Sequence, residues 1–155
     1  MSQPLEATEP EHQELLAYRV GDEEYAVDIM SVREIRGWTP ATPLPHAPHF
    51  VTGVINLRGA VLPIVDLSAR LGFSEIEPNT RSVTIVMQFG EQAIGVLVDA
   101  VSDIFTVARA DIQPPPEVTQ STGEGFISGL VIVKKRMIRL VDLTQALPTS
   151  LKVPA

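Results

Sequence analysis

The feature of this sequence that most constrains its fold is an internal repeat. Residues 15–36, shifted by 69 positions, align without a gap on residues 84–105, and residues 50–72, shifted by 76, align on residues 126–148. The turn glycines match in order, as do the Val-Asp-Leu triplets at 65–67 and 141–143. Alternation of apolar residues would align strands but not turns, so we infer a duplication with a longer loop in the second half, at Pro114–Gly125.

Each repeat consists of short, alternating apolar runs separated by turn residues, which is typical of β-hairpins. The four predicted hairpins pair Leu15–Val20 with Glu24–Ile29, Phe50–Leu57 with Ala60–Leu67, Ser82–Phe89 with Gln92–Asp99, and Ile127–Val133 with Met137–Leu143. Helical signals are limited to short turns at Asp66–Gly72 and Asp142–Pro148, where the aspartate is the expected N-cap. The pattern predicts an all-β fold of two similar five-stranded barrels, packed around a shared apolar interface.

The repeat also suggests domain boundaries. We expect one domain over residues 14–148, made of two barrel subdomains at about 14–80 and 81–148 whose ends could be interleaved. Residues 1–13 are polar and acidic and are expected to form a disordered tail, and residues 149–155 a flexible one. The N-terminus lacks the order of a signal peptide, no apolar run approaches the roughly 20 residues of a membrane span, and cysteine is absent, so we expect a cytoplasmic protein.

Composition and motifs argue against nucleic-acid binding and against catalysis. The net charge is -7 and the pI about 4.9, and the basic cluster Lys134–Arg136 is too short for the stripe that nucleic acid requires. His46 and His49 lie three apart without a third metal ligand nearby, and no nucleophile elbow is present. Capping explains both Asp66 and Asp142. We therefore predict no catalytic residue, no metal and no cofactor.

Two charged residues interrupt apolar segments without an obvious structural task. Arg58 stands at the tip of a predicted hairpin, before Gly59, which can supply the positive φ that a tight turn needs. Glu34 lies between Val32 and Ile35, which the pattern places in the interior. Arg58 can be an ordinary solvated turn residue and Glu34 an edge-strand charge, or each can belong to a binding site. The chemistry of the residues leaves both readings open.

Four segments of the sequence resemble those of a known family. GVINLRGAVLPIVDL, at Gly53–Leu67, resembles the signature of the CheW family of bacterial chemotaxis coupling proteins. GDEEYAVDIMSVREI, at Gly21–Ile35, and GVLVDAVSDI, at Gly95–Ile104, resemble further blocks of that family in the same order. TPLPHAPHFVTG, at Thr42–Gly53, resembles the loop that precedes the signature. The resemblance covers about residues 14–148.

The resemblance implies a pair of SH3-like β-barrels and a non-enzymatic adaptor. Family members join the cytoplasmic tip of methyl-accepting chemoreceptors to the regulatory domain of the histidine kinase CheA, in membrane-associated arrays that can include other CheW-like domains. At the matching positions it implies receptor-binding roles for Arg58 and Glu34, and a receptor-facing groove associated with Val32 and Gly53. It assigns no kinase-binding residue, and no role passes to the second repeat, where Lys134-Lys135 replaces Arg58-Gly59.

Other functions remain open from the sequence. The chain could be a β-barrel protein that binds a small molecule, although the sequence shows no convergent polar pocket, or it could be a structural homodimer. At 155 residues it has no room for an added receiver domain or for the kinase itself, so we expect a stand-alone CheW-type domain without membrane insertion.

Overall fold

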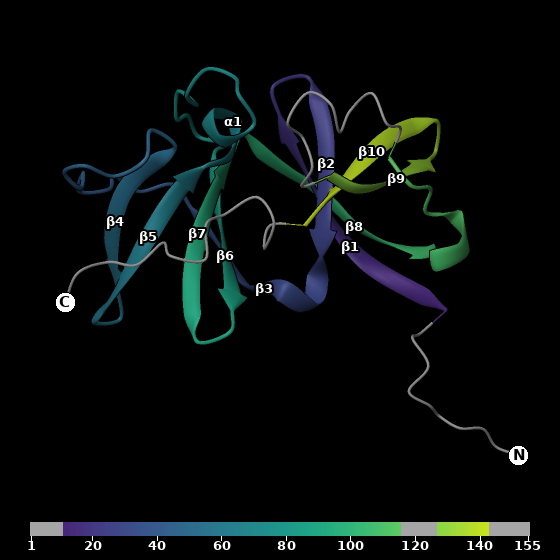
Figure 1. Ribbon diagram of the computed structural model, residues 1–155, viewed down its shortest axis with the longest axis horizontal. Helices are drawn as coiled ribbons and strands as arrows, with labels where there is room; N and C mark the ends of the chain where they lie inside the picture. The colour runs from purple at the N-terminus through teal and green to yellow at the C-terminus, as the bar shows by residue number, and fades with distance from the viewer. Residues whose placement is uncertain (1–10, 116–126, 143–155) are drawn as a thin grey trace, which may run out of the picture.

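The described residues of the computed structural model, 11–115 and 127–142, form two five-stranded SH3-like barrels that stand side by side (Figure 1). In chain order the elements are β1 (His12–Val20), β2 (Glu23–Asp28), the 3-10 turn η1 (Ile29–Ser31), β3 (Val32–Gly37), β4 (Val51–Leu57), β5 (Ala60–Asp66), α1 (Leu67–Arg70), β6 (Val83–Phe89), β7 (Gln92–Val98), β8 (Ala100–Ala108), η2 (Arg109–Asp111), β9 (Ile127–Val133) and β10 (Arg136–Val141). The predicted all-β class and the two five-stranded units are confirmed.

All four predicted hairpins form, as the antiparallel pairs β1–β2, β4–β5, β6–β7 and β9–β10. The expected helical turn after β5 is also present as α1, and Asp66 caps it, since its Oδ1 accepts a hydrogen bond from the Ala69 amide at 3.1 Å. The second expected turn, at Asp142–Pro148, lies outside the described residues apart from its first residue. Local pattern and turn chemistry were therefore sufficient to predict the hairpins.

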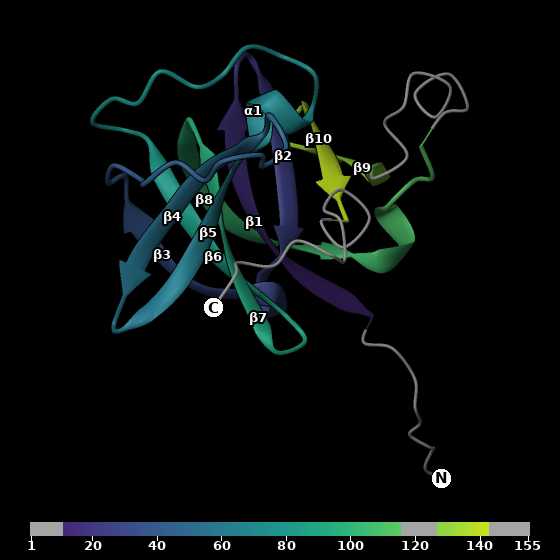
Figure 2. The same ribbon diagram turned by 60° about the vertical axis from the view of Figure 1, so that its left-hand side comes forward.

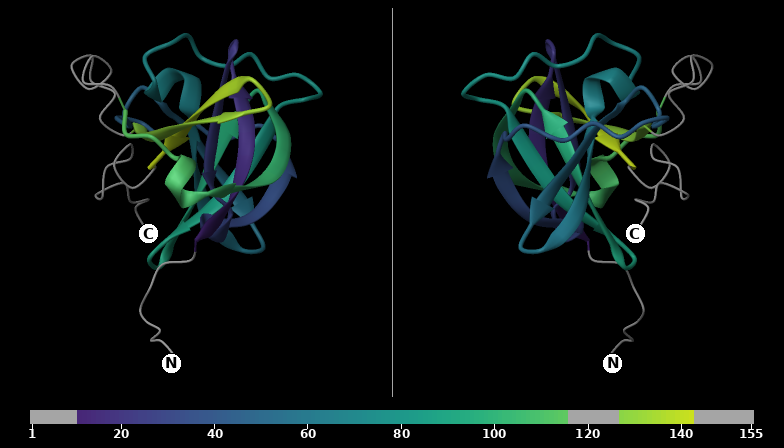
Figure 3. Two further views of the ribbon diagram at one scale, coloured as in Figure 1. Left: turned by 90° about the vertical axis from the view of Figure 1, so that its right-hand side faces the viewer. Right: turned by 90° about the vertical axis from the view of Figure 1, so that its left-hand side faces the viewer.

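The division of the chain between the two sheets differs from the expected boundary at residues 80 and 81. One sheet, the central barrel, has the order β3-β6-β7-β5-β4 and is drawn from residues 32–98. The other, the terminal barrel, has the order β8-β1-β2-β10-β9 and joins strands from both ends of the chain. Each barrel thus combines the first hairpin of one repeat with three strands of the other. Figure 3 shows the terminal barrel facing the viewer on the left and the central barrel on the right.

This exchange is possible because the two repeats offer equivalent partners. The pair Leu57–Ala60 at the end of the β4–β5 hairpin becomes, after the shift of 76, the pair Val133–Arg136 at the end of β9–β10. The parallel pairs obey the same shifts: Ile64–Gly95 in the central barrel corresponds to Leu140–Ala26 in the terminal barrel. The registers therefore support the inferred duplication position by position.

The expected N-terminal tail also needs a correction at its inner end. Residues 1–10 lie outside the described part of the chain, as do 116–126 and 143–155. His12 and Gln13, however, already belong to β1, because they pair with Ala108 and Val107 at the end of β8. The order of the chain therefore begins before residue 14.

Three apolar clusters stabilise this arrangement. One lies inside each barrel, and the largest lies between them and includes Tyr18 and Val27 of the terminal barrel with Val65 and Ile85 of the central barrel. Leu67 of α1 is fully buried in the same cluster. Burial of apolar area is the main favourable term in folding, so the predicted shared interface between the barrels is a true part of the core.

Candidate functional site

The structure brings two of the expected site residues, Glu34 and Arg58, into direct contact. Arg58 lies at the tip of the β4–β5 hairpin, which projects from the central barrel in Figure 2, and Glu34 lies on β3. The Arg58 Nη2 atom donates a hydrogen bond to the Glu34 Oε1 atom at 2.7 Å. Since β3 and β4 are the two edge strands of the sheet, this ion pair links the edges on which the barrel closes.

The conformation of the turn explains how Arg58 reaches this position. Arg58 has φ 53° and Gly59 has φ 85°, and the flanking Leu57 and Ala60 form the last pair of the hairpin. Two central residues with positive φ define a type I′ turn, which matches the twist of the strands. Asn56 stabilises the turn, because its Oδ1 accepts a hydrogen bond from the Gly59 amide at 2.9 Å. The Arg58 side chain is left 65% exposed.

A second arginine completes the cluster, and sequence reasoning missed it. The Arg36 Nη1 atom lies 2.9 Å from Glu34 Oε2, so each carboxylate oxygen of Glu34 has its own guanidinium. The hydrogen bond from Arg58, and then that from Arg36, hold the pKa of the Glu34 carboxyl below its ordinary value. The available signal was the spacing of two, which places residues 34 and 36 on the same face of a strand.

The same alternation corrects the predicted burial of Ile35. Glu34 and Arg36 occupy the half-buried face of β3, so Ile35 points outward and is 44% exposed. Val32, at the start of β3, was predicted to lie in the interior, and it is half-buried and packs against the cluster between the barrels. An exposed isoleucine beside an ion pair gives this edge of the barrel a mixed apolar and charged surface.

Gly53 is buried, and its surroundings give it a structural task. Its φ is +152°, and a Cβ at this position would overlap the carbonyl oxygen of Thr42. Thr42 and Val54 exchange two backbone hydrogen bonds of 2.8 and 2.9 Å, which dock the proline-rich loop onto β4. The repeat equivalent, Gly129, is similarly crowded, since a Cβ there would lie 2.7 Å from a side-chain carbon of Ile112. The glycine therefore serves loop docking in both halves.

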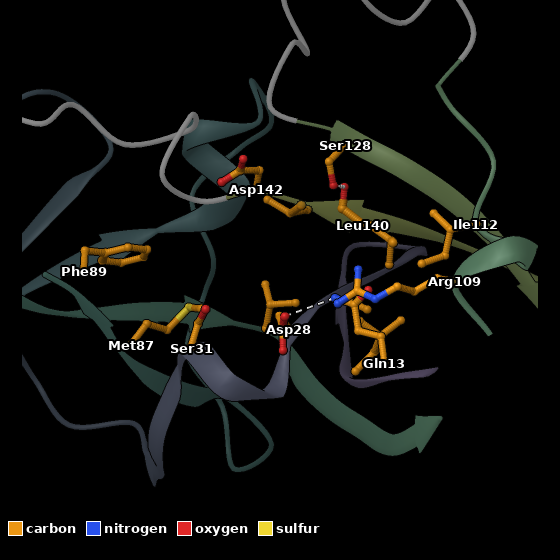
Figure 4. A pocket seen from close by; sticks show the side chains of 14 residues that line it. Gln13, Asp28, Ser31, Met87, Phe89, Arg109, Ile112, Ser128, Leu140 and Asp142 are labelled. Carbon is orange, nitrogen blue, oxygen red and sulfur yellow. Dashed lines mark hydrogen bonds between the residues drawn. The ribbon is translucent and has the colours of Figure 1, made fainter. Parts of the chain in front are cut away.

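A separate cavity of about 370 Å³ lies between the barrels and bears on the small-molecule alternative (Figure 4). Gln13 Nε2 donates a hydrogen bond to Asp28 Oδ2 at 3.1 Å, and Asp28 Oδ1 accepts another from the Met30 amide at 2.9 Å. Arg109 and Asp142 in its wall also have interaction partners. Gln13 and Asp28 in this cavity are thus already hydrogen-bonded to protein atoms.

Within residues 11–115 and 127–142, no group of three or more His, Cys, Asp or Glu side chains could hold a metal ion. No helix there is both long enough and apolar enough to cross a membrane.

Comparisons with known proteins agree with this architecture. The family model described as the CheW-like domain matches residues 14–150. The chemotaxis protein CheW of Rhizobium meliloti (strain 1021) is 58% identical over 136 residues, which cover 88% of each chain. The probable chemotaxis protein CheW of Rhizobium etli is 52% identical over 143 residues, 92% of each chain. The crystal structure of the scaffolding protein TtCheW from Thermoanaerobacter tengcongensis superposes with a TM-score of 0.81 at 28% identity and covers 97% of both chains.

Proposed function

The chain belongs to the CheW family, and from this premise we propose that it couples methyl-accepting chemoreceptors to the histidine kinase CheA. It is a chemotaxis coupling or scaffold protein in the coarse sense that its relatives support. In the finer proposal it binds the receptor's cytoplasmic tip and the regulatory domain of the kinase, without catalysis of its own. It would act in arrays at the cytoplasmic face of the membrane, where other CheW-like domains are further partners.

The observation that carries the proposal is the ion pair between Glu34 and Arg58. Both side chains lie at the edge where the central barrel closes, and the guanidinium remains largely exposed although it is paired. An exposed charge beside apolar surface fixes the register of a partner more than it adds affinity. We therefore assign receptor binding to Arg58 and Glu34, with Val32 on the same strand as Glu34 and Gly53 acting through the loop that it seats.

The rigid β-scaffold supports an adaptor role on physical grounds. Two surfaces held in fixed geometry lose little conformational entropy when partners bind. The exposed Ile35 beside the ion pair offers apolar surface to an amphipathic helix, the mode in which a helical receptor hairpin would dock. The assignment leaves the kinase-binding residues open.

The test is Arg58→Ala, with thermal melting and receptor-stimulated kinase activity measured on the same preparation. Because Arg58 is exposed, we expect an unchanged melt and a loss of coupling on the order of tenfold or more. Arg81→Ala, which removes an equally exposed arginine elsewhere, is the matched control. Unchanged coupling in Arg58→Ala would remove this residue from the site, and an unfolded variant would assign it a structural role.

A charge swap tests whether Glu34 and Arg58 contact the partner or only each other. The double variant Glu34→Arg with Arg58→Glu can restore the link between the barrel edges but reverses the charges that a partner meets. We expect it to fold and to remain defective in coupling. Recovery of full coupling would mean that the pair acts only within the chain.

A further inference from the structure

A hollow at the end of the central barrel adjoins the ion pair and shares Arg58 with it. It has a volume of about 450 Å³ and is bounded by β3, the β4–β5 hairpin and the β6–β7 hairpin. Its charged and polar rim and its apolar floor are lined by Arg33, Arg58, Gln88, Leu57, Leu62 and Ala93. It is thus an open surface depression with two arginines at its edge.

Arg33 reaches the hollow because β3 contains a bulge. Val32 pairs with Met87 and Glu34 with Val86, so Arg33 is an extra residue without a cross-strand partner. Bulges re-aim side chains next to functional sites. The Arg33 Nη1 atom donates a hydrogen bond to Gln88 Oε1 at 3.0 Å, which orients the guanidinium with a neutral amide and leaves its charge uncompensated by that contact.

The charge at this end of the barrel is opposite in sign to that of the whole chain. The net charge of the protein is -7. Among the residues that line the hollow, however, Arg33 and Arg58 are basic and only Glu91 is acidic, so the lining has one positive charge in excess. Glu34 is already shared between Arg36 and Arg58. An acidic group approaching from outside is therefore favoured over a basic one.

The terminal barrel shows what the equivalent place can hold. Glu24 is only 8% exposed there, and Arg136 Nε lies 3.3 Å from its Oε1 atom. Shifted by 69 and 76, these two positions become Ala93 and Ala60, and both alanines line the hollow. The duplicated scaffold thus accommodates a carboxylate–guanidinium pair at this place, whereas the central barrel has two methyl groups there.

We propose that this hollow receives an acidic side chain of a partner protein, held by Arg33 and Arg58 where the terminal barrel uses its own Glu24. A planar guanidinium matches a carboxylate through paired N–H donors. The floor adds a second requirement, because Leu62 is 2% exposed and Leu57 and Ala93 pack against it in the core. The occupant is therefore an Asp or Glu flanked by aliphatic residues. The inference rests on the proposed adaptor function and adds the chemistry of the partner's contact.

The experiment measures binding of the purified chain to a receptor cytoplasmic fragment and to a kinase regulatory domain, from 50 to 300 mM salt. We expect Arg33→Glu to weaken binding of one partner at least tenfold at low salt, with Arg33→Gln intermediate. The control Arg81→Glu makes the same change in net charge away from the hollow, and we expect at most a twofold effect. The difference in affinity between wild type and Arg33→Glu should become smaller as the salt concentration rises, since mobile ions screen exposed charges.

A transplant provides an independent check. The double variant Ala60→Arg with Ala93→Glu copies the Glu24–Arg136 pair into the hollow and should block the same partner while the melt is retained. Conversely, replacing the partner's acidic contact by lysine should rescue Arg33→Glu. If the wild-type chain binds neither probe, the adaptor function fails. If it binds but Arg33→Glu and Arg81→Glu behave alike, only the acidic docking site is overturned.

Discussion

The substitution Gly53→Ala tests whether Gly53 seats the proline-rich loop on β4 or contacts the receptor directly. The added methyl group would overlap the Thr42 carbonyl oxygen and would lie 2.6 Å from its carbon, in a backbone conformation that only glycine adopts readily. The proline-rich loop must therefore move away from β4, or the strand must deform. Either response disturbs the two hydrogen bonds between Thr42 and Val54.

The magnitude follows from these two terms. Backbone strain at a residue held in a sparsely populated region costs roughly 1–3 kcal/mol. Loss of two hydrogen bonds, each worth about 0.5–1.5 kcal/mol net, adds a similar amount. A middle value of about 4 kcal/mol would lower the melting temperature by roughly 8–16 °C in a chain of this size.

The assay is thermal and urea denaturation followed by far-UV circular dichroism, with receptor binding measured at a temperature where the variant is folded. Gly37→Ala is the matched control, because no heavy atom lies within 4 Å of its added Cβ, and we expect a change within about 1 kcal/mol. Gly129→Ala should fall between the two, since the atom it meets most closely belongs to a side chain that can shift. A Gly53→Ala variant that melts like wild type but loses receptor binding would refute loop docking and would make Gly53 a direct contact.

Three further predictions concern buried and strained groups. Tyr18 is 1% exposed and its hydroxyl has no hydrogen-bond partner in the described part of the chain, so Tyr18→Phe should stabilise the fold by about 1 kcal/mol in urea denaturation, and destabilisation would contradict this. Lys135 has φ 68° without being glycine, so Lys135→Gly should raise the unfolding free energy by roughly 1 kcal/mol, and an unchanged value would show that the turn is unstrained. Burial is the main cause that raises the pKa of Asp66 above its ordinary 3.8, so the folded chain holds this proton more tightly than the unfolded chain. The stability that the tighter binding of this proton adds is fully present below pH 3.8 and is lost as pH rises through the higher pKa of the folded chain. If the unfolding free energies of wild type and Asp66→Asn run parallel between pH 3 and 6, Asp66 makes no such contribution.

The hairpins were predictable because their signals are local. Alternating apolar residues and turn glycines specify a strand pair from a dozen neighbouring positions, and all four predicted hairpins formed. Their assignment to barrels was not predictable in this way. After a duplication, β3 and β8 present equivalent edges, and local pattern does not distinguish the hairpin of its own repeat from that of the other. The choice is made by long-range packing; the expected boundary near residue 80 allowed interleaved ends but did not say which strands exchange.

The site was predictable in part for a similar reason. The chemistry of the residues alone did not decide whether Arg58 and Glu34 are surface charges or binding residues, and only the family resemblance favoured a binding role. Arg36 could have been found from its spacing to Glu34, whereas Arg33 depends on a bulge that alternation does not reveal. The prediction that Ile35 is buried is wrong. Glu34 and Arg36, which form the ion pairs, lie on the half-buried face of β3, so Ile35 lies on the exposed face.

The exchange of hairpins between repeats has a consequence for how such a chain can serve as an adaptor. Within residues 11–115 and 127–142, two connections pass between the barrels, from β2 through η1 to β3 and from β7 through Asp99 to β8. On their own, two short connections would allow the two barrels to move independently of each other. The large shared cluster, with Tyr18, Val65 and Leu67 each at most 1% exposed, prevents this because separation would expose it to water. Since the hollow lies at the ends of the β4–β5 and β6–β7 hairpins, a partner docked there would be held in a fixed orientation relative to any partner on the terminal barrel. The duplication thus supplies two similar barrels on one rigid body, and the carboxylate–arginine pair that only the terminal barrel has at this place makes the two chemically distinct.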